Sequence, residues 1–248
     1  MSYQQTLDQM HEMGWHGAIE AYRVQQSNTA YHSMGFDERL GLITDAELND
    51  RAQRREKRLL RGAKLKLPTA CIEDLDYTKS RSLDRQVIAS LTNCGWVDQG
   101  QHLIFTGPTG VGKTFAACAF GRQVIRMGKP VIYARTSRLL EELEIARADG
   151  RIPKLRLKLA KPAVLILDDW AMAPLQAQGR QDLLELIDDR TGRGSLILTS
   201  QLPVDQWHDY IGEPTLADAI LDRILHRAHF VELQGESMRR RQPKGGAK

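Results

Sequence analysis

The sequence predicts an α/β fold in which a five-stranded parallel sheet is covered by helices on both faces and preceded by a small helical domain. Three observations predict it. After Pro68, short aliphatic runs alternate with segments of helical length. A glycine-rich loop joins one such run to an apolar helix. Before Pro68, apolar residues recur only at helical spacing. A chain of 248 residues suffices for one α/β domain and a small appendage.

The N-terminal part, residues 1–67, is expected to form the helical domain. Apolar side chains from Leu7 to Tyr22 have helical spacing, and a second helical stretch runs over 36–61. Thr44 and Glu47, three residues apart, predict a capping box that begins its main segment. Because so few residues are apolar here, we expect a thin core that depends on the rest of the protein or on a partner.

The second domain is expected over residues 68–248. Its predicted helices are 113–127, 137–148 and 178–190. The predicted strands are residues 102–106, 131–134, 163–168, 195–200 and 229–233.

Composition excludes several classes of protein. The chain is 42% hydrophobic and 27% charged, which excludes wholesale disorder and fibrous structure. No apolar run approaches the roughly 20 residues that a membrane span needs, and the first residues lack a secretory signal. We therefore expect a cytoplasmic protein with no membrane partner. Cys71, Cys94 and Cys118 have no metal-binding or redox spacing and are expected in the core.

The net charge of +4 hides an uneven distribution. Residues 51–66 carry +7, residues 147–161 carry +5 and residues 237–248 carry +5, so the rest of the chain carries −13. Clustered Lys and Arg on an acidic body are typical of proteins that bind a polyanion, because binding releases condensed counterions. The alternative interpretation is a solvated helix face with a basic tail.

A phosphate-binding loop follows the first predicted strand. The segment GPTGVGKT matches G-x-x-x-x-G-K-[ST] at every specified position, between the strand LIF and the helix FAACAF. Its residues are Gly107, Pro108, Thr109, Gly110, Val111, Gly112, Lys113 and Thr114. Glycines let successive N–H groups face the phosphates. Lys113 is expected to reach the β- and γ-phosphates of ATP, and the Thr114 hydroxyl to ligate Mg²⁺.

Two carboxylates end the next buried strand. Four aliphatic residues precede Asp168 and Asp169, which is typical of a strand buried on both faces. Carboxylates at the carboxyl end of such a strand emerge beside the phosphate-binding loop. We expect Asp168 to hold the Mg²⁺ shell and Asp169 to polarise the attacking water.

Polar residues also end the fourth predicted strand. Thr199, Ser200 and Gln201 follow Leu196-Ile197-Leu198. If this strand is central, Thr199 or Gln201 would lie where it can contact the γ-phosphate or the water. The two residues remain alternatives.

The chain resembles P-loop ATPases of the AAA+ class, and among them the IstB-like transposition helper ATPases. The resemblance rests on the helical N-terminal region, GPTGVGKT, LILDDW, ILTSQLP, LADAILDRI and GESMRR. DnaC-type helicase loaders share much of this pattern, and LILDDW with ILTSQLP is closer to the IstB side. Few residues follow the last strand, so the resemblance implies a minimal C-terminal lid.

The resemblance also implies roles for two arginines. Arg223 matches the arginine finger that enters the ATP site of an adjacent subunit, which implies a homo-oligomer. Arg239 matches the sensor arginine of the lid, and Thr199 or Gln201 matches the sensor on the fourth strand. Simpler interpretations remain open, namely a helix-surface arginine paired with Asp218 or Asp222 and a plain basic tail.

The family implies duplex DNA and a transposase of the same element as partners. No base-reading motif is visible, so we expect contacts mainly with the DNA backbone. The candidate DNA-binding residues are Arg51, Arg54, Arg55, Lys57, Arg58, Arg61, Lys154, Arg156 and Lys158. The expected function is an ATP-dependent regulator of transposition that assembles on DNA and hands a target to the transposase. The alternatives are a helicase loader, a small-molecule kinase and a DNA-binding adaptor that holds ATP without turnover.

Overall fold

The computed structural model describes residues 2–77 and 83–238. Contacts divide the chain into two compact units, Met1–Arg58 and Leu59–Lys248. This division precedes the boundary expected after residue 67. The physical reason is that Leu59, Leu60 and Leu65 pack against the core of the second unit.

The first unit is helical. It contains α1 (Tyr3–Glu12), α2 (His16–Ser27), the 3₁₀ helix η1 (Thr29–Ser33) and most of α3 (Phe36–Ala63). Its buried apolar residues in the described part are only Leu7, Ala18, Ile19 and Ile43. The thin core that we expected for the N-terminal domain is therefore present.

The expected capping box at Thr44 is wrong. Thr44 lies inside the continuous helix α3, where its hydroxyl donates to the Gly41 carbonyl. Glu47 instead accepts a hydrogen bond from the N–H of Ala18, at 3.2 Å, in the first turn of α2. Its other oxygen pairs with Arg51 at 2.6 Å. Glu47 therefore satisfies a free N–H of a different helix, which no local sequence pattern reveals.

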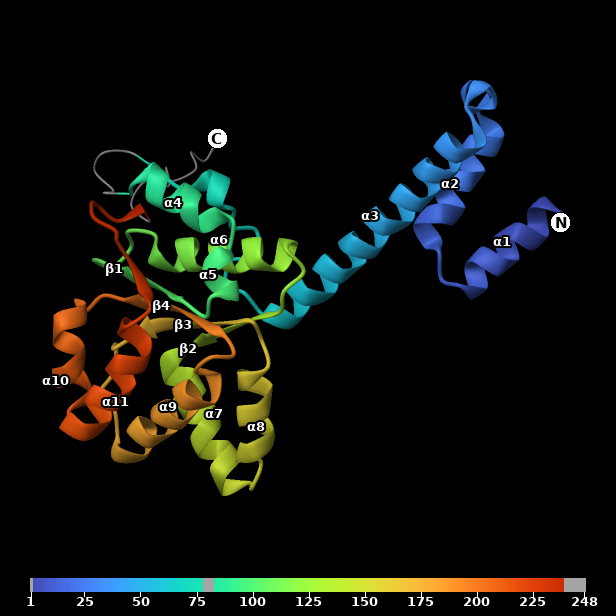
Figure 1. Ribbon diagram of the computed structural model, residues 1–248. Helices are drawn as coiled ribbons and strands as arrows, with labels where there is room; N and C mark the ends of the chain where they lie inside the picture. Colours follow the sequence, from blue (N-terminus) through green and yellow to red (C-terminus); the bar gives the residue numbers. More distant parts are fainter. Residues whose placement is uncertain (1, 78–82, 239–248) are drawn as a thin grey trace, which may run out of the picture. The chain divides into compact units, whose positions relative to one another are not determined.

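The second unit is built on a five-stranded parallel sheet (Figure 1). Its strands are β1 (His102–Thr106), β2 (Val131–Arg135), β3 (Val164–Trp170), β4 (Ser195–Ser200) and β5 (Ala228–Glu232). Their order is β2-β3-β4-β1-β5, so β4 lies between the strand that carries Asp168 and the strand that precedes the glycine-rich loop.

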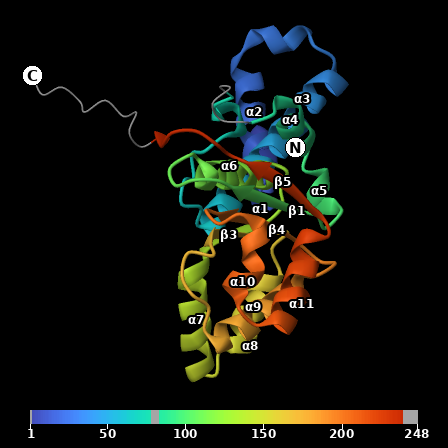
Figure 2. The same ribbon diagram turned by 90° about the vertical axis from the view of Figure 1, so that its left-hand side faces the viewer.

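Helices cover both faces of the sheet, as the alternating pattern predicts. On one face lie α4 (Arg85–Thr92), α5 (Gly95–Asp98) and α6 (Lys113–Arg126), with the 3₁₀ helix η2 (Ile72–Asp74). On the other lie α7 (Thr136–Ala148), α8 (Ile152–Ala160), α9 (Ala177–Arg190), the 3₁₀ helix η4 (Val204–Gln206), α10 (Trp207–Ile211) and α11 (Pro214–Leu225). Figures 1 and 2 show these three layers from two sides.

Each strand contributes alternate side chains to two separate cores. On β1, Leu103 and Phe105 pack toward α6, whereas Ile104 packs toward α9 and α11. Cys94 and Cys118 are buried as expected, but Cys71 is only half-buried because it lies in the segment before η2.

The five predicted strands are all present, with ends that differ by no more than two residues. The helix α8 is missing from the prediction. Its sequence, IPKLRLKLA, contains a proline and alternating basic residues, but the proline lies in the first turn, where its missing N–H costs nothing. Among the described residues, no helix is long and apolar enough to cross a membrane. The predicted lid lies largely outside the described residues.

Candidate functional site

The glycine-rich loop runs from the end of β1 to the first turn of α6. Gly107, Gly110 and Gly112 have φ values of 136°, 83° and 110°, which residues with a Cβ rarely adopt. A Cβ on Gly107 would lie 2.0 Å from the carbonyl oxygen of Leu233, and a Cβ on Gly110 would lie 2.2 Å from Ser237 Oγ. Only glycine fits where the loop meets the segment after β5.

Lys113 begins α6 and is buried at the centre of the loop. Its Nζ donates to the carbonyl oxygens of Gly107 at 2.7 Å and Pro108 at 2.8 Å. The positive N-terminus of α6 points to the same place. The loop therefore places a buried cation, a helix N-terminus and backbone N–H groups next to one another. These are the features of a phosphate site.

Asp168 is fully buried and is surrounded by hydroxyl groups from three elements. Thr114 Oγ1, from α6, lies 2.9 Å from Oδ1 and 3.1 Å from Oδ2. Thr199, from β4, donates to Oδ1 at 2.6 Å. Tyr133, from β2, donates to Oδ2 at 2.6 Å, and burial together with this hydrogen bond raises the pKa of Tyr133. Three side-chain hydroxyl groups therefore converge on one buried carboxylate.

Asp169 points in a different direction from Asp168 because the backbone bulges. The register between β3 and β4 shifts between Leu167 and Trp170, and Asp169 has a φ of 57°. Its N–H donates to Thr199 Oγ1 at 3.0 Å. Its Oδ2 accepts from Arg135, at the end of β2, at 2.7 Å. The hydrogen bond to Asp169 raises the pKa of Arg135.

Thr199 and Gln201, the two sensor candidates, occupy different positions. Thr199 is buried and contacts Asp168, whereas Gln201 is exposed and donates to the sulfur of Met172 at 3.1 Å. Gln201 nevertheless lines a cavity of about 330 Å³ together with the loop and Asp169. The rest of its lining includes the apolar side chains of Leu75, Phe115 and Leu233 as well as Asp74 and Asp76.

The residues at this site fit Mg²⁺ that is bound together with a phosphate. Mg²⁺ prefers hard oxygen ligands and is commonly held by one or two protein groups plus substrate phosphates. The Thr114 hydroxyl and the Asp168 carboxylate supply such oxygens beside the loop. Within residues 2–77 and 83–238, no group of three or more His, Cys, Asp or Glu side chains is placed to hold a metal ion.

Arg223 does not lie at the phosphate loop of its own chain. It is in the last turn of α11, where Nε pairs with Asp188 at 2.9 Å and Nη1 donates to the Ala219 carbonyl at 2.8 Å. The segment after α11 leads into β5, whose first residue pairs with His102 at the start of β1. The phosphate loop follows the other end of β1. Arg223 and the loop therefore lie at opposite ends of the strands.

The predicted sensor Arg239 lies outside the described residues. Two residues that precede it do reach the loop. Met238 N donates to the Gly110 carbonyl at 2.9 Å, and Ser237 lies against Gly110. The segment after β5 therefore crosses the phosphate-binding loop.

The candidate DNA-binding residues are exposed, except for Arg156. Arg156 is half-buried and pairs with Glu185 and Asp189 of α9. Arg51 and Arg54 pair with Glu47 and Asp50 on their own helix. The remaining candidates are exposed on α3 or α8, namely Arg55, Lys57, Arg58, Arg61, Lys154 and Lys158. The two ion pairs of Arg156 assign it to packing α8 on α9, which its sequence position does not reveal.

Three residues at the site belong to none of the sequence motifs described above. Tyr133 and Arg135 contact Asp168 and Asp169, and Lys66 Nζ lies 3.6 Å from Asp168 Oδ2. Arg135 pairs in register with Asp168 across β2 and β3. The polar end of β2 is the sequence feature that could indicate Tyr133 and Arg135. It indicates them only if β2 is known to lie next to β3.

A family model described as IstB-like ATP binding protein matches residues 8–245 of the chain. The chain is 45% identical over 237 residues to the insertion sequence ATP-binding protein y4pL of Sinorhizobium fredii, which covers 96% of each chain. It is 51% identical over 203 residues to the ATP-binding protein of insertion sequence IS1162 of Pseudomonas fluorescens, which covers 82% of this chain and 88% of that one.

Solved structures share the fold of the second unit. The structure of DnaI has a TM-score of 0.57 at 20% identity, covering 74% of this chain and 98% of that chain. The DnaC helicase loader has a TM-score of 0.54 at 19% identity, covering 66% and 97%. The predicted AAA+ fold is thereby confirmed.

Proposed function

Because the chain belongs to the family of IstB-like ATP-binding proteins, we propose that it is a Mg²⁺-dependent ATPase that regulates transposition of an insertion sequence. In this proposal it assembles on duplex DNA, helps to select or remodel the target, and hands it to the transposase of the same element. ATP hydrolysis is the switch that ends the DNA-bound state. Two relatives named as insertion sequence ATP-binding proteins support the assignment.

The proposal depends above all on the contact between Thr114 and Asp168 beside the phosphate loop. The loop N–H groups and Lys113 would bind the β- and γ-phosphates, and Lys113 would exchange its two loop carbonyls for phosphate oxygens. Thr114 and Asp168 would hold Mg²⁺ next to them. When bound, Mg²⁺ neutralises phosphate charge that develops during transfer.

Asp169 is the candidate that orients the attacking water. It lines the same cavity as the loop, and its carboxylate leaves the strand in a different direction from Asp168. In the state described here, Arg135 holds that carboxylate at 2.7 Å. Hydrolysis therefore requires Asp169 to accept a water proton in place of the Arg135 hydrogen bond.

Arg223 is proposed to act on the ATP of a neighbouring subunit. It lies at the end of the strands opposite its own phosphate loop. It can therefore reach only a γ-phosphate that is bound by another copy of the chain. An arginine supplied in this way stabilises transition-state charge. The active form would then be a homo-oligomer with ATP sites between subunits.

The exposed basic residues of α3 and α8 are proposed to contact the DNA backbone. They offer cations without any base-reading motif, which favours contact with phosphates over contact with bases. Arg156 is left out of this set because it is bound to Glu185 and Asp189. We therefore expect low sequence specificity and strong salt dependence.

The proposal is tested by measuring ATP hydrolysis and sedimentation with and without duplex DNA, for the wild type and for Lys113→Ala. We expect the wild type to form large assemblies on DNA and to hydrolyse ATP faster there. Lys113→Ala should lose both hydrolysis and ATP-dependent assembly. A wild type that stayed monomeric and hydrolysed no ATP in either condition would overturn the proposal.

The choice of DNA separates this proposal from a helicase loader. In the same assay, a regulator of transposition should prefer duplex DNA, whereas a loader should prefer a single strand. For a small-molecule kinase, the rate of ATP turnover should not depend on duplex or single-stranded DNA. It should depend on an added phosphate acceptor.

A further inference from the structure

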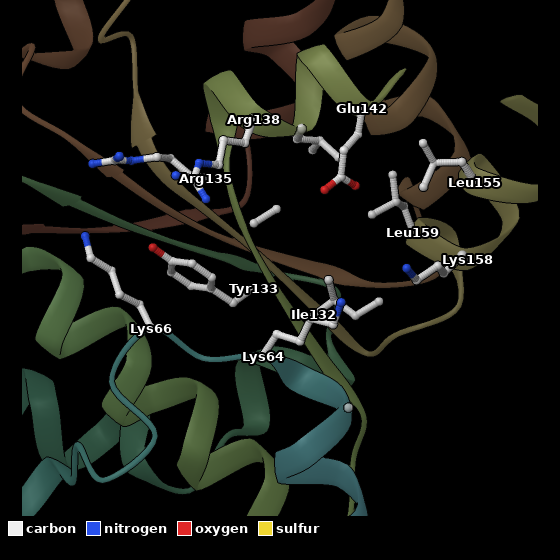
Figure 3. Close-up of a pocket in the computed structure, with 13 residues that line it drawn as sticks. Lys64, Lys66, Ile132, Tyr133, Arg135, Arg138, Glu142, Leu155, Lys158 and Leu159 are labelled. Carbon is white, nitrogen blue, oxygen red and sulfur yellow. The ribbon is translucent and has the colours of Figure 1, made fainter. Parts of the chain in front are cut away.

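A cavity of about 390 Å³ lies beside β2, the edge strand of the sheet, and is separate from the cavity at the phosphate loop. It is lined by the segment after α3, by β2 and by the facing sides of α7 and α8. Its charged lining consists of five cations, Lys64, Lys66, Arg135, Arg138 and Lys158, and one carboxylate, Glu142. We call it the β2 cavity (Figure 3).

The positive charge continues beyond the β2 cavity. A neighbouring hollow of about 710 Å³ shares Glu142, Leu155 and Lys158 with it, and adds Arg151, Lys154 and Lys161. In the part of the chain that the structure describes, Lys64, Arg138 and Lys158 form no ion pair. The two hollows together are lined by eight basic side chains and one carboxylate, and one of the eight, Arg151, pairs with Asp149 beside the lining. Such a track is suited to a polyanion whose charges repeat along its length.

Two cations of this cavity also contact the carboxylates of the candidate ATPase site. Lys66 lies 3.6 Å from Asp168 and Arg135 lies 2.7 Å from Asp169. Their side chains are nevertheless 41% and 46% exposed. Figure 3 shows Lys66, Tyr133 and Arg135 at one end of the cavity and Leu155, Leu159 and Lys158 at the other. Lys66 and Arg135 therefore lie between the cavity and the ATPase site and belong to both.

We propose that the β2 cavity binds a backbone phosphate of duplex DNA, and that the bound phosphate draws Lys66 and Arg135 away from Asp168 and Asp169. This inference rests on the proposed function, because it names the place where DNA stimulates hydrolysis. Without DNA, Arg135 occupies the oxygen of Asp169 that the attacking water needs. With DNA, the carboxylates are released for Mg²⁺ and water.

The exchange is physically reasonable because the competing interactions are similar. Ion pairs with partly exposed partners contribute little, so Arg135 is not held irreversibly. A phosphodiester offers two non-bridging oxygens that share one negative charge, and arginine binds such a pair of oxygens as it binds a carboxylate. An acidic peptide could also contact such cations, but the continuation of the charge through two hollows favours the longer polyanion.

The binding step is tested with Arg138→Gln, because Arg138 lines the cavity without contacting Asp168 or Asp169. The matched control is Arg193→Gln, an exposed arginine in the turn after α9. Binding of a labelled duplex oligonucleotide is measured by anisotropy across a salt series. We expect Arg138→Gln to weaken binding and to make the log–log salt dependence shallower by about 0.9, as for one lost phosphate contact. Arg193→Gln should match the wild type.

The coupling step is tested with Arg135→Ala and, independently, Lys66→Ala. We expect hydrolysis without DNA to rise in Arg135→Ala, and the ratio of rates with and without DNA to fall toward one. Lys66→Ala should change this ratio in the same direction. Binding of a fluorescent ATP analogue to each variant shows that its loop is intact. If Arg135→Ala loses ATP binding, the ratio measured for Lys66→Ala decides.

The outcomes separate this inference from the proposed function. If the wild type is stimulated by DNA, and both the ratio and the DNA binding are unchanged in these variants, the proposed function stands and the β2 cavity is not the DNA sensor. Polyglutamate serves as the second probe. If Arg138→Gln weakens binding of polyglutamate but not of duplex DNA, the ligand is an acidic peptide and the proposal is wrong.

Discussion

The hydroxyl oxygen of Thr199 links the two carboxylate residues of the candidate site. It donates to Asp168 Oδ1 at 2.6 Å and accepts from the N–H of Asp169 at 3.0 Å. Thr199 belongs to β4, and the two aspartates lie at the bulge of β3. One side chain therefore fixes both the position of the buried Asp168 carboxylate and the position of the Asp169 backbone N–H at the bulge.

Substitution of Thr199 by valine should slow hydrolysis more than it weakens ATP binding. Valine keeps the shape but removes the donor to Asp168 and the acceptor for Asp169. Partners of this kind, when removed, typically cost about 10- to 100-fold in metal affinity or activity. We expect a loss of this size in kcat and a higher Mg²⁺ requirement, measured by phosphate release over a Mg²⁺ series.

Thr199→Ser is the matched control because it retains the hydroxyl. It should keep most of the activity. A Thr199→Val variant with the wild-type rate and Mg²⁺ dependence would show that Thr199 is only a packing residue, and would leave Gln201 as the sensor candidate.

The local parts of the site could be predicted from the sequence, and the parts that depend on strand order could not. The loop from Gly107 to Thr114 is contiguous, so its motif contains all of its geometry. Asp168 is predictable beside it because parallel strands end at one edge of the sheet. Arg135 reaches Asp169 only because β2 neighbours β3, and nothing in the sequence orders the strands.

Charged residues show the same limit. Lys154, Arg156 and Lys158 look equivalent along α8, yet only Arg156 faces Glu185 and Asp189, which lie 29 and 33 residues away. A charge pattern predicts that a segment is basic. It does not predict which of its cations is already neutralised by another helix.

Arg223→Ala should bind ATP but hydrolyse it far more slowly than the wild type. An arginine that stabilises the transition state is worth about 10³- to 10⁵-fold. If Arg223 acts between subunits, mixing Arg223→Ala with Asp169→Asn should restore activity, because Asp169→Asn keeps the phosphate loop, and some interfaces combine the intact Asp169 of one variant with the intact arginine of the other. In a random equal mixture we expect about a quarter of the wild-type rate.

Asp188→Asn is the control for this experiment, because it removes the partner of Arg223 within the same chain and leaves the arginine in place. It should retain activity. If the mixture is no more active than the separate variants, Arg223 does not act in trans.

Arg190 is predicted to stabilise the second unit rather than to act in catalysis. It is 1% exposed, and its guanidinium donates to the carbonyls of Leu159 and Ser195, both at 2.7 Å. Burial lowers its pKa to about 10. Arg190→Leu would leave these buried carbonyls without this donor, so we expect a loss of about 2–4 kcal/mol in unfolding free energy, measured with urea. Arg193→Leu, in the exposed turn nearby, should change it by less than about 0.5 kcal/mol.

His102 is predicted to make the stability of the second unit depend on pH. It is buried, and its Nδ1 accepts the N–H of Leu196 at 3.1 Å, which requires a neutral ring. Burial lowers its pKa below the ordinary value of 6.5. Below pH 6.5 the unfolded chain therefore binds a proton that the folded protein rejects. The unfolding free energy should consequently decrease as pH falls from 6.5 to the lowered pKa, by about 1.4 kcal/mol per pH unit, and should be insensitive to His102 above 6.5.

His102→Gln keeps an acceptor for Leu196 but does not titrate, so urea unfolding should show a shallower pH dependence in this window. The exposed His226, changed to Gln, serves as the matched control in the same unit and should leave the slope as in the wild type. An identical slope in His102→Gln and the wild type would mean that the ring accepts a proton without losing its place between β1 and β4. The neutral ring would then not be required for the hydrogen bond that joins these two strands.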